Sequence, residues 1–226
     1  VSTIDRLDFS NETTSAPGNN LPQIRKSLAA TSSNSYGYFG GGRVEPSPFN
    51  TVCTIERLDF SNETTSTLGN NLSQNRRFLA AVSSSSYGYF GGGYSFPYRS
   101  TIDRLDFSNE TTSAPGNNLP QATNRLAAVS SSSYGYFGGG FTPPSVCTIN
   151  RLDFSNETLS LPGNGLPQAR NTLAAVSSSS YGYFGGGYAP PTNVCTIDRL
   201  DFSNETTSAP GNGLPQARSG LAAVSN

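Results

Sequence analysis

The sequence contains no histidine, no methionine and no tryptophan among its 226 residues. Without an imidazole the chain cannot form a Ser/His/Asp or Cys/His nucleophile system, or a zinc site of the histidine type. It also has no side chain that titrates near neutral pH at its ordinary pKa. These absences remove the commonest hydrolytic and metal-dependent chemistries.

Unbalanced charge and long apolar runs are also missing. The 15 acidic and 14 basic side chains give a net charge of −1. They form no basic cluster, so nucleic acid is not an expected partner. No apolar run approaches the ~18 residues that a membrane helix needs, and no membrane partner is expected. Because the first residue is Val1, we expect a processed chain or a fragment of a longer product.

Glycine and proline are abundant, and the sequence repeats itself. The 24 Gly and 15 Pro favour short strands and tight turns over helices. A Thr-Ile-Asp-Arg-Leu-Asp-Phe-Ser-Asn-Glu-Thr segment, with minor variants, recurs at spacings of 51, 47, 47 and 48 residues. Its copies start at Thr3, Thr54, Thr101, Thr148 and Thr196. This period is typical of propellers or solenoid arrays, and we expect residues 1–226 to form one domain of five repeats.

Each repeat is predicted to contain four short strands. In the unit that begins at Leu173, strand a is expected over 173–177, strand b over 181–184, strand c over 196–202 and strand d around 205–208. A Gly triplet ends strand b, where close backbone approach or positive φ is available to glycine. Four strands per unit fit a propeller blade, with small residues on the innermost strand. A helical solenoid does not fit the Pro and Gly content, and a β-solenoid usually has shorter coils.

A small hydrophobic strand, then Tyr-Gly-Tyr-Phe-Gly-Gly, a variable loop and Arg-Leu-Asp together resemble the kelch repeat. The doublets Gly40-Gly41, Gly91-Gly92, Gly138-Gly139 and Gly185-Gly186 match the family's Gly-Gly pair. The family's tryptophan is absent, and Leu stands in place of the Tyr before Asp. We expect Phe9, Phe60, Phe107, Phe154 and Phe202 to supply the missing volume between blades.

The resemblance is closer to kelch-like repeat proteins of marine bacteriophages, cyanophages in particular, which carry Tyr-Phe-Gly-Gly-Gly and Asp-Arg-Leu-Asp-Phe-Ser-Asn. It implies an all-β, kelch-like β-propeller of about five blades, located in a virion as a tail, fibre or capsid-exterior protein. The implied partners are other virion proteins, copies of the chain itself or a host surface glycan. The alternative is an extracellular adhesin or filament subunit of a marine microbe.

The number of strands leaves one blade incomplete. The sequence predicts five strands of types a, c and d, but only four Tyr-Gly-Tyr-Phe-Gly strands of type b. If residues 221–226 joined the strands near Thr3 in a closing blade, its second strand would be missing. Unpaired backbone groups inside a sheet cost about 1–3 kcal/mol each when buried, so we expect the chain to be incomplete or the position to be filled by a neighbouring molecule.

Charged pairs recur in every unit, two residues apart on strand c. One interpretation is a ring of ligand-binding charges. The favoured one is a set of structural ion pairs within or between blades. The residues are Arg6 and Asp8, Arg57 and Asp59, Arg104 and Asp106, Arg151 and Asp153, and Arg199 and Asp201.

The loops after the Gly triplets differ between repeats and carry aromatic and charged residues. They either present a binding surface on a rigid frame or only cover blade edges. The second interpretation is slightly favoured. The candidate binding residues are Arg43, Glu45, Phe49, Tyr94, Phe96, Tyr98, Arg99, Phe141 and Tyr188.

The remaining motifs favour structural roles. Asn-Glu-Thr sequons are glycan acceptors in a eukaryotic secretory setting and otherwise turn residues, which we favour. They start at Asn11, Asn62, Asn109, Asn156 and Asn204. Cys53, Cys147 and Cys195 occupy equivalent places in different units, too far apart for disulfides, and are expected to be free thiols. No catalytic group, metal ligand set or cofactor site stands out, so we expect a protein that is not an enzyme.

Overall fold

The computed structural model describes residues 2–46 and 50–225 as short strands joined by turns and loops. These residues contain no helix, and so none with the length and apolar character of a membrane span. The expectation of an all-β protein is confirmed.

Four antiparallel sheets of four strands each form the body of the molecule. Each is built from consecutive strands a to d in the expected order, apart from short extra strands in some loops. The first sheet contains β4 (Ala29–Ser32), β5 (Tyr36–Gly40), β7 (Ile55–Asp59) and β8 (Thr65–Thr67). The second contains β9 (Ala80–Ser83), β10 (Tyr87–Gly91), β11 (Ile102–Asp106) and β12 (Thr112–Ser113). The third contains β13 (Ala127–Ser130), β14 (Tyr134–Gly138), β15 (Ile149–Asp153) and β16 (Leu159–Ser160). The fourth contains β17 (Ala174–Ser177), β18 (Tyr181–Gly185), β21 (Ile197–Asp201) and β22 (Thr207–Ser208).

Three pairs of short strands complete the structure. β1 (Arg6–Asp8) and β2 (Thr13–Ser15) form a hairpin that corresponds to strands c and d of a further unit. β3 (Arg25–Lys26) pairs with β6 (Arg43–Val44), and β19 (Tyr188–Ala189) pairs with β20 (Thr192–Asn193).

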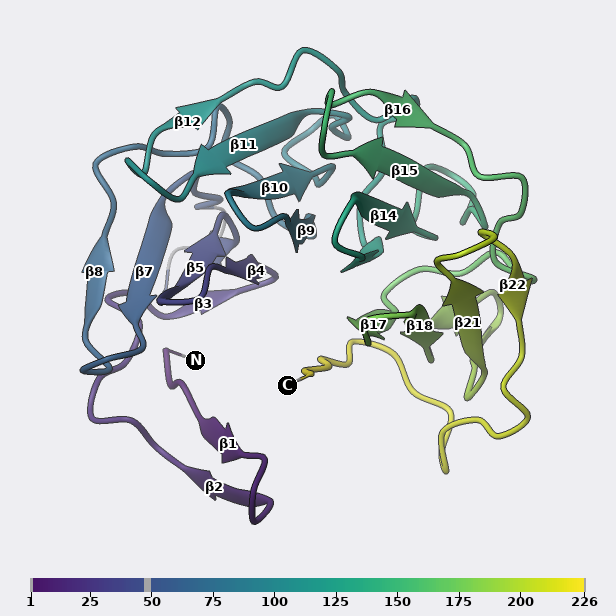
Figure 1. Cartoon of the computed structure of the whole chain (residues 1–226), viewed down its shortest axis with the longest axis horizontal. Coiled ribbons are helices and arrows are strands. Elements are labelled where there is room, and N and C mark those ends of the chain that lie inside the picture. The colour runs from purple at the N-terminus through teal and green to yellow at the C-terminus, as the bar shows by residue number, and fades with distance from the viewer. Residues whose placement is uncertain (1, 47–49, 226) are drawn as a thin grey trace.

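The sheets follow one another around an arc (Figure 1), with the strands of type a facing the middle and those of type d outside. Strand β4 contacts β9, β9 contacts β13, and β13 contacts β17. The hairpin of β1 and β2 lies between the first sheet and the open side of the arc, and both termini lie near the middle (Figure 1).

Three apolar clusters lie between consecutive sheets. In the first, Tyr38 and Ile55 of one sheet meet Phe90 and Leu105 of the next, all of them buried. Strand b can approach its neighbour closely because it carries glycine. A Cβ on Gly40 would lie only 2.7 Å from the Phe90 ring. The repeated Tyr-Gly-Tyr-Phe-Gly pattern is thus a packing requirement of every sheet-to-sheet contact.

Candidate functional site

The same group of four side chains joins each sheet to the next. Between the first two sheets, Glu110 accepts a hydrogen bond from Arg57 at 2.9 Å and one from the Tyr38 hydroxyl at 3.3 Å. Phe107 stacks on Tyr38 with ring centroids 5.3 Å apart. We call this Arg–Tyr–Glu–Phe group the clasp. Burial and the nearby Glu110 charge raise the pKa of Tyr38 to about 12, because both disfavour the phenolate.

The clasp repeats at the next two interfaces. Its members there are Arg104, Tyr89, Glu157 and Phe154, then Arg151, Tyr136, Glu205 and Phe202. The expectation that phenylalanines fill the space between units is therefore confirmed for Phe107, Phe154 and Phe202. It is wrong for Phe9 and Phe60, which are 50% and 47% exposed. The described residues provide no tyrosine of an adjacent strand b for either ring to stack on.

The expected ion pairs between these arginines and aspartates, within or between blades, are not found among the described residues. Arg57, Arg104 and Arg151 reach a glutamate of the next sheet instead, and Arg6 of the hairpin likewise pairs with Glu63. Arg199 forms no ion pair within the described residues. Each aspartate stays at the turn between strands c and d. There it accepts hydrogen bonds from the serine two residues later, as Asp59 does from the Ser61 hydroxyl and N–H. These bonds lower the pKa of Asp59. Asp8, Asp106, Asp153 and Asp201 form the same turn.

A second set of ion pairs, which the sequence analysis missed, is fully buried. Arg25 pairs with Glu56, Arg76 with Asp103 and Arg170 with Asp198, each joining the segment before strand a to strand c of the same unit. Arg76 also donates to the carbonyls of Phe90 and Thr101. In the third sheet Thr123 and Asn150 stand at the corresponding positions, so both charges are absent together. That paired replacement is the signal that could have revealed these contacts in the sequence.

The variable loops bring part of the expected binding surface together. Tyr98 lies between Tyr94 and Phe141, with ring centroids 5.4 and 6.1 Å away. A cavity of about 240 Å³ is lined by these three rings together with Arg77 and Arg125. A neighbouring cavity of about 440 Å³ is lined by Arg43, Arg77, Tyr94 and Phe96 among others. Among the described residues no carboxylate lines either cavity, and of the lining arginines only Arg43 forms an ion pair, with Glu45 at 3.5 Å. We call the two cavities the cationic loop surface.

Other expected binding residues lie outside this surface. Glu45 forms an ion pair with Lys26 at 2.8 Å, and Arg99 lines neither cavity. Tyr188, at the repeat position of Tyr94 and Phe141, is 37% exposed and makes no aromatic contact within the described chain. Phe49 lies outside the described residues.

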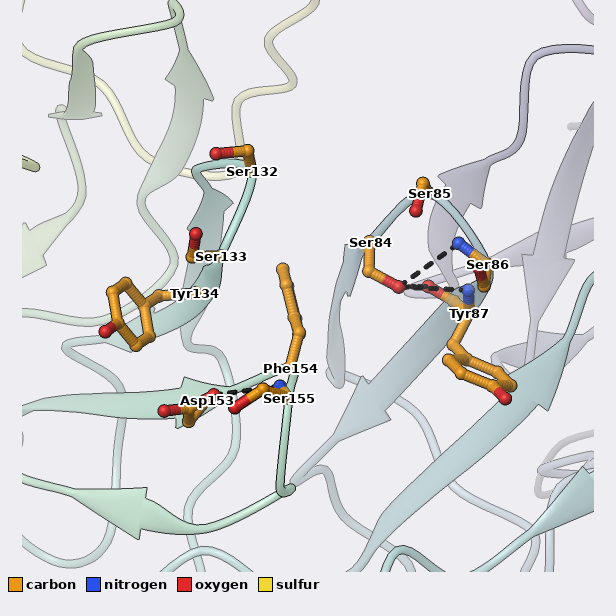
Figure 2. Close-up of a pocket in the computed structure, with 10 residues that line it drawn as sticks. All are labelled: Ser84, Ser85, Ser86, Tyr87, Ser132, Ser133, Tyr134, Asp153, Phe154 and Ser155. Atoms are coloured by element: carbon orange, nitrogen blue, oxygen red, sulfur yellow. Dashed lines mark hydrogen bonds between the residues drawn. The ribbon is translucent and has the colours of Figure 1, made fainter.

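The opposite ends of the strands form three clefts of one kind, between consecutive sheets. Figure 2 shows the cleft between the second and third sheets, of about 420 Å³, with Ser84 to Tyr87 on one side and Ser132 to Tyr134 on the other. The other two, of about 470 and 440 Å³, have equivalent linings. The Ser84 hydroxyl oxygen accepts from the Ser86 and Tyr87 N–H groups, and Asp153 accepts from Ser155 (Figure 2). Ser84 and Asp153 are thus engaged within their own turns.

The sequons and cysteines lie where their structural interpretation places them. In each Asn-Glu-Thr turn the asparagine side chain accepts hydrogen bonds from the threonine N–H and hydroxyl, with Asn62 and Thr64 at 3.0 and 2.7 Å. Asn11, Asn109, Asn156 and Asn204 do the same. Cys53, Cys147 and Cys195 are free thiols, as expected. Within residues 2–46 and 50–225, no three His, Cys, Asp or Glu side chains gather as a metal site would require.

Comparison of the chain with protein-family models gives no match, and comparison with curated proteins gives none either.

Proposed function

We propose that the chain is a non-enzymatic recognition module on a kelch-like β-propeller frame, and that it belongs to a phage virion as a tail, fibre or capsid-exterior protein. The four sheets are the complete blades in this proposal, and the hairpin of β1 and β2 belongs to a fifth. The contacts between innermost strands and the arc of sheets support it. The virion location rests on the resemblance of the repeats to those of marine phages.

The cationic loop surface carries the proposed recognition. Three sheet-to-sheet interfaces repeat the same clasp, whereas the loops differ in every repeat and gather aromatic rings and arginines around two cavities. Aromatic faces bind the C–H faces of sugars, and arginine forks bind carboxylates or sulfates. The ligand class we propose is therefore an acidic glycan of a host surface, with another virion protein as the second type of partner.

A glycan array of neutral and acidic oligosaccharides tests this function. We expect acidic oligosaccharides to be retained by the chain and lost with Arg77→Ala or Tyr98→Ala. Tyr188→Ala is the matched control, because it removes an aromatic residue of the same repeat position that lies apart from both cavities. Retention that is equal in all three variants, or no retention of any acidic glycan, would contradict the proposal. Mass spectrometry of purified particles tests the virion location.

A filament subunit is the second candidate, and the two ends of the arc favour it. Arg199 and Tyr183 of the fourth sheet have the positions of Arg151 and Tyr136, but no sheet within the described residues supplies their glutamate and phenylalanine. Glu12 and Phe9 of the hairpin are the corresponding unmatched residues. If copies join end to end, sedimentation will show concentration-dependent association. Glu12→Arg should abolish that association, and Glu12→Arg combined with Arg199→Glu should restore it.

A further inference from the structure

The strand β1 has one unpaired edge. It pairs only with β2, whereas strand c of each four-stranded sheet lies between strands b and d. No strand of the described residues lies along its other side. Such an edge presents a row of backbone donors and acceptors that can pair with an added strand.

Apolar side chains near this edge are exposed although their counterparts in the complete sheets are buried or half-buried. Leu7, Phe9, Phe60 and Val224 are four of the eight large hydrophobic residues found exposed in the described chain. Leu7 is 38% exposed and Val224 67%, whereas the equivalent Leu105 and Val82 are 0% and 4% exposed. In the second sheet, Leu105 and Val82 lie opposite Gly88 and Tyr89 of strand b. A strand b between β1 and residues 221–225 would therefore cover Leu7 and Val224.

The first sheet already presents the half of a clasp that this missing strand would complete. Glu63 holds Arg6, as Glu110 holds Arg57, but lacks the tyrosine hydroxyl that Glu110 also binds. The Phe60 ring lacks the tyrosine on which Phe107 stacks. A single strand carrying a tyrosine at the position of Tyr38 would fill both vacancies.

The fourth sheet shows the corresponding vacancy on the other side. A Cβ on Gly40, Gly91 or Gly138 would meet the phenylalanine of the next sheet at 2.7 Å. At Gly185 the nearest atom would be 3.8 Å away, on Ile197 of the same sheet. By the order of the repeats, the phenylalanine that Gly185 lacks belongs to strand b of the unit that follows the fourth sheet, in which residues 221–225 have the position of strand a.

We infer that the free edge of β1 is an acceptor site for a β-strand of the sequence Tyr-Gly-Tyr-Phe-Gly, donated by a segment other than β5, β10, β14 and β18. The register follows from the pairing of β5 with β7, in which Tyr36, Gly37 and Tyr38 lie opposite Asp59, Leu58 and Arg57. The donated strand places its first tyrosine opposite Asp8, its glycine opposite Leu7 and its second tyrosine opposite Arg6. The glycine is required because Phe9 covers it, as the Phe60 ring lies 3.2 Å from the Cβ position of Gly37.

A second folded copy of the chain is not the donor. Its four strands of this sequence, β5, β10, β14 and β18, are each paired on both edges within their own sheets. The inference rests on the propeller-like arrangement proposed above, but not on recognition by the cationic loop surface.

A labelled peptide with the sequence of residues 131–140, Ser-Ser-Ser-Tyr-Gly-Tyr-Phe-Gly-Gly-Gly, tests the site by fluorescence anisotropy against the full chain. We expect saturable binding and slower amide hydrogen exchange in β1. A peptide with Gly135→Val should not bind, because its side chain would meet Phe9. Phe60→Ala in the protein should weaken binding by about twofold to tenfold, the factor that one aromatic pair contributes.

Phe107→Ala is the matched control. It removes a ring that is already stacked on Tyr38, so it should lower Tm while leaving peptide binding unchanged. Tyr98→Ala on the cationic loop surface should change neither, which separates this site from the proposed glycan function. The inference is overturned if the peptide fails to bind and β1 exchange is unaffected, if the Gly135→Val peptide binds equally, or if β1 is already protected in the chain alone.

Discussion

The interface between the second and third sheets and the open side of the arc contain the same residue types in different states. At the interface, Arg104, Tyr89, Glu157 and Phe154 form one connected group. At the open side, Phe9 is half exposed and Glu12 and Arg199 form no ion pair within the described chain. A repeat unit therefore does not bury these side chains by itself, and its stability depends on having a neighbour on each side.

The largest difference should come from the arginine that precedes strand a. Arg76 is fully buried with Asp103, so Arg76→Ala leaves a buried carboxylate without its partner and should cost about 3–5 kcal/mol. Arg218 has the same repeat position at the open side and is exposed. Arg218→Ala should change the free energy of unfolding in urea by no more than about 0.5 kcal/mol. If both substitutions lowered the free energy of unfolding equally, Arg218 would have to be buried in solution, and the arc of sheets would be closed.

The glycine that ends strand b provides a second pair of variants. The new methyl group in Gly138→Ala would lie 2.7 Å from Phe184, and such overpacking costs about 1–3 kcal/mol. Gly185→Ala meets no atom closer than 3.8 Å and should leave the midpoint of thermal unfolding unchanged. A drop in Tm for Gly185→Ala would indicate that a phenylalanine occupies this place in solution.

The clasp glutamate should give a smaller effect. Glu157→Gln removes the charge that Arg104 and Tyr89 share, and this partly exposed pair should contribute about 1 kcal/mol. Glu12→Gln is the control at the open side, where no change in the free energy of unfolding is expected. If both substitutions lower the free energy of unfolding equally, the interface and the open side do not differ in this contact.

The smallest expected effect is a loss of folding stability at alkaline pH. The pKa of Tyr38 is raised to about 12, so the folded chain keeps a proton that the unfolded chain loses near its ordinary value of about 10. Stability should therefore fall as pH rises from about 10 towards about 12. Burial likewise raises the pKa of Tyr89 and Tyr136.

Tyr38→Phe removes one of these three contributions. The fall in urea stability between these pH values should be shallower in this variant than in the unaltered chain. An identical slope would mean that burial and the Glu110 charge do not raise the pKa of Tyr38 in solution.

Most of the strands could be predicted from the sequence, because the glycine and turn residues that end each strand lie next to it in the chain. The Gly triplet after Tyr181 and the Ser-Asn turn after Phe202 place the strand boundaries within one or two residues of β18 and β21. The missing strand b is also evident from the sequence, because it contains only four Tyr-Gly-Tyr-Phe-Gly segments for five units. Local patterns suffice for strands and turns because each depends on neighbours a few residues away.

The partners of the charged side chains could not be predicted in the same way. Arg57 lies two residues from Asp59, but its partner Glu110 is one full repeat away. In a near-perfect repeat every unit offers the same glutamate, so spacing does not say which one is reached. The gathering of Tyr98 and Phe141 depends in the same way on how two sheets are placed side by side.

In the third unit both members of the buried ion pair are replaced, by Thr123 and Asn150. This paired replacement limits how such repeats can be exchanged by recombination. Thr123 lies before β13 and Asn150 lies in β15, so β13 and β14 separate the two residues in the sequence. A recombination between repeats that broke the chain between these positions would join Arg to Asn or Thr to Asp, and would bury a lone charge. Breakpoints outside this interval keep the two residues together. Selection for folding alone therefore favours inheritance of the interval as one block.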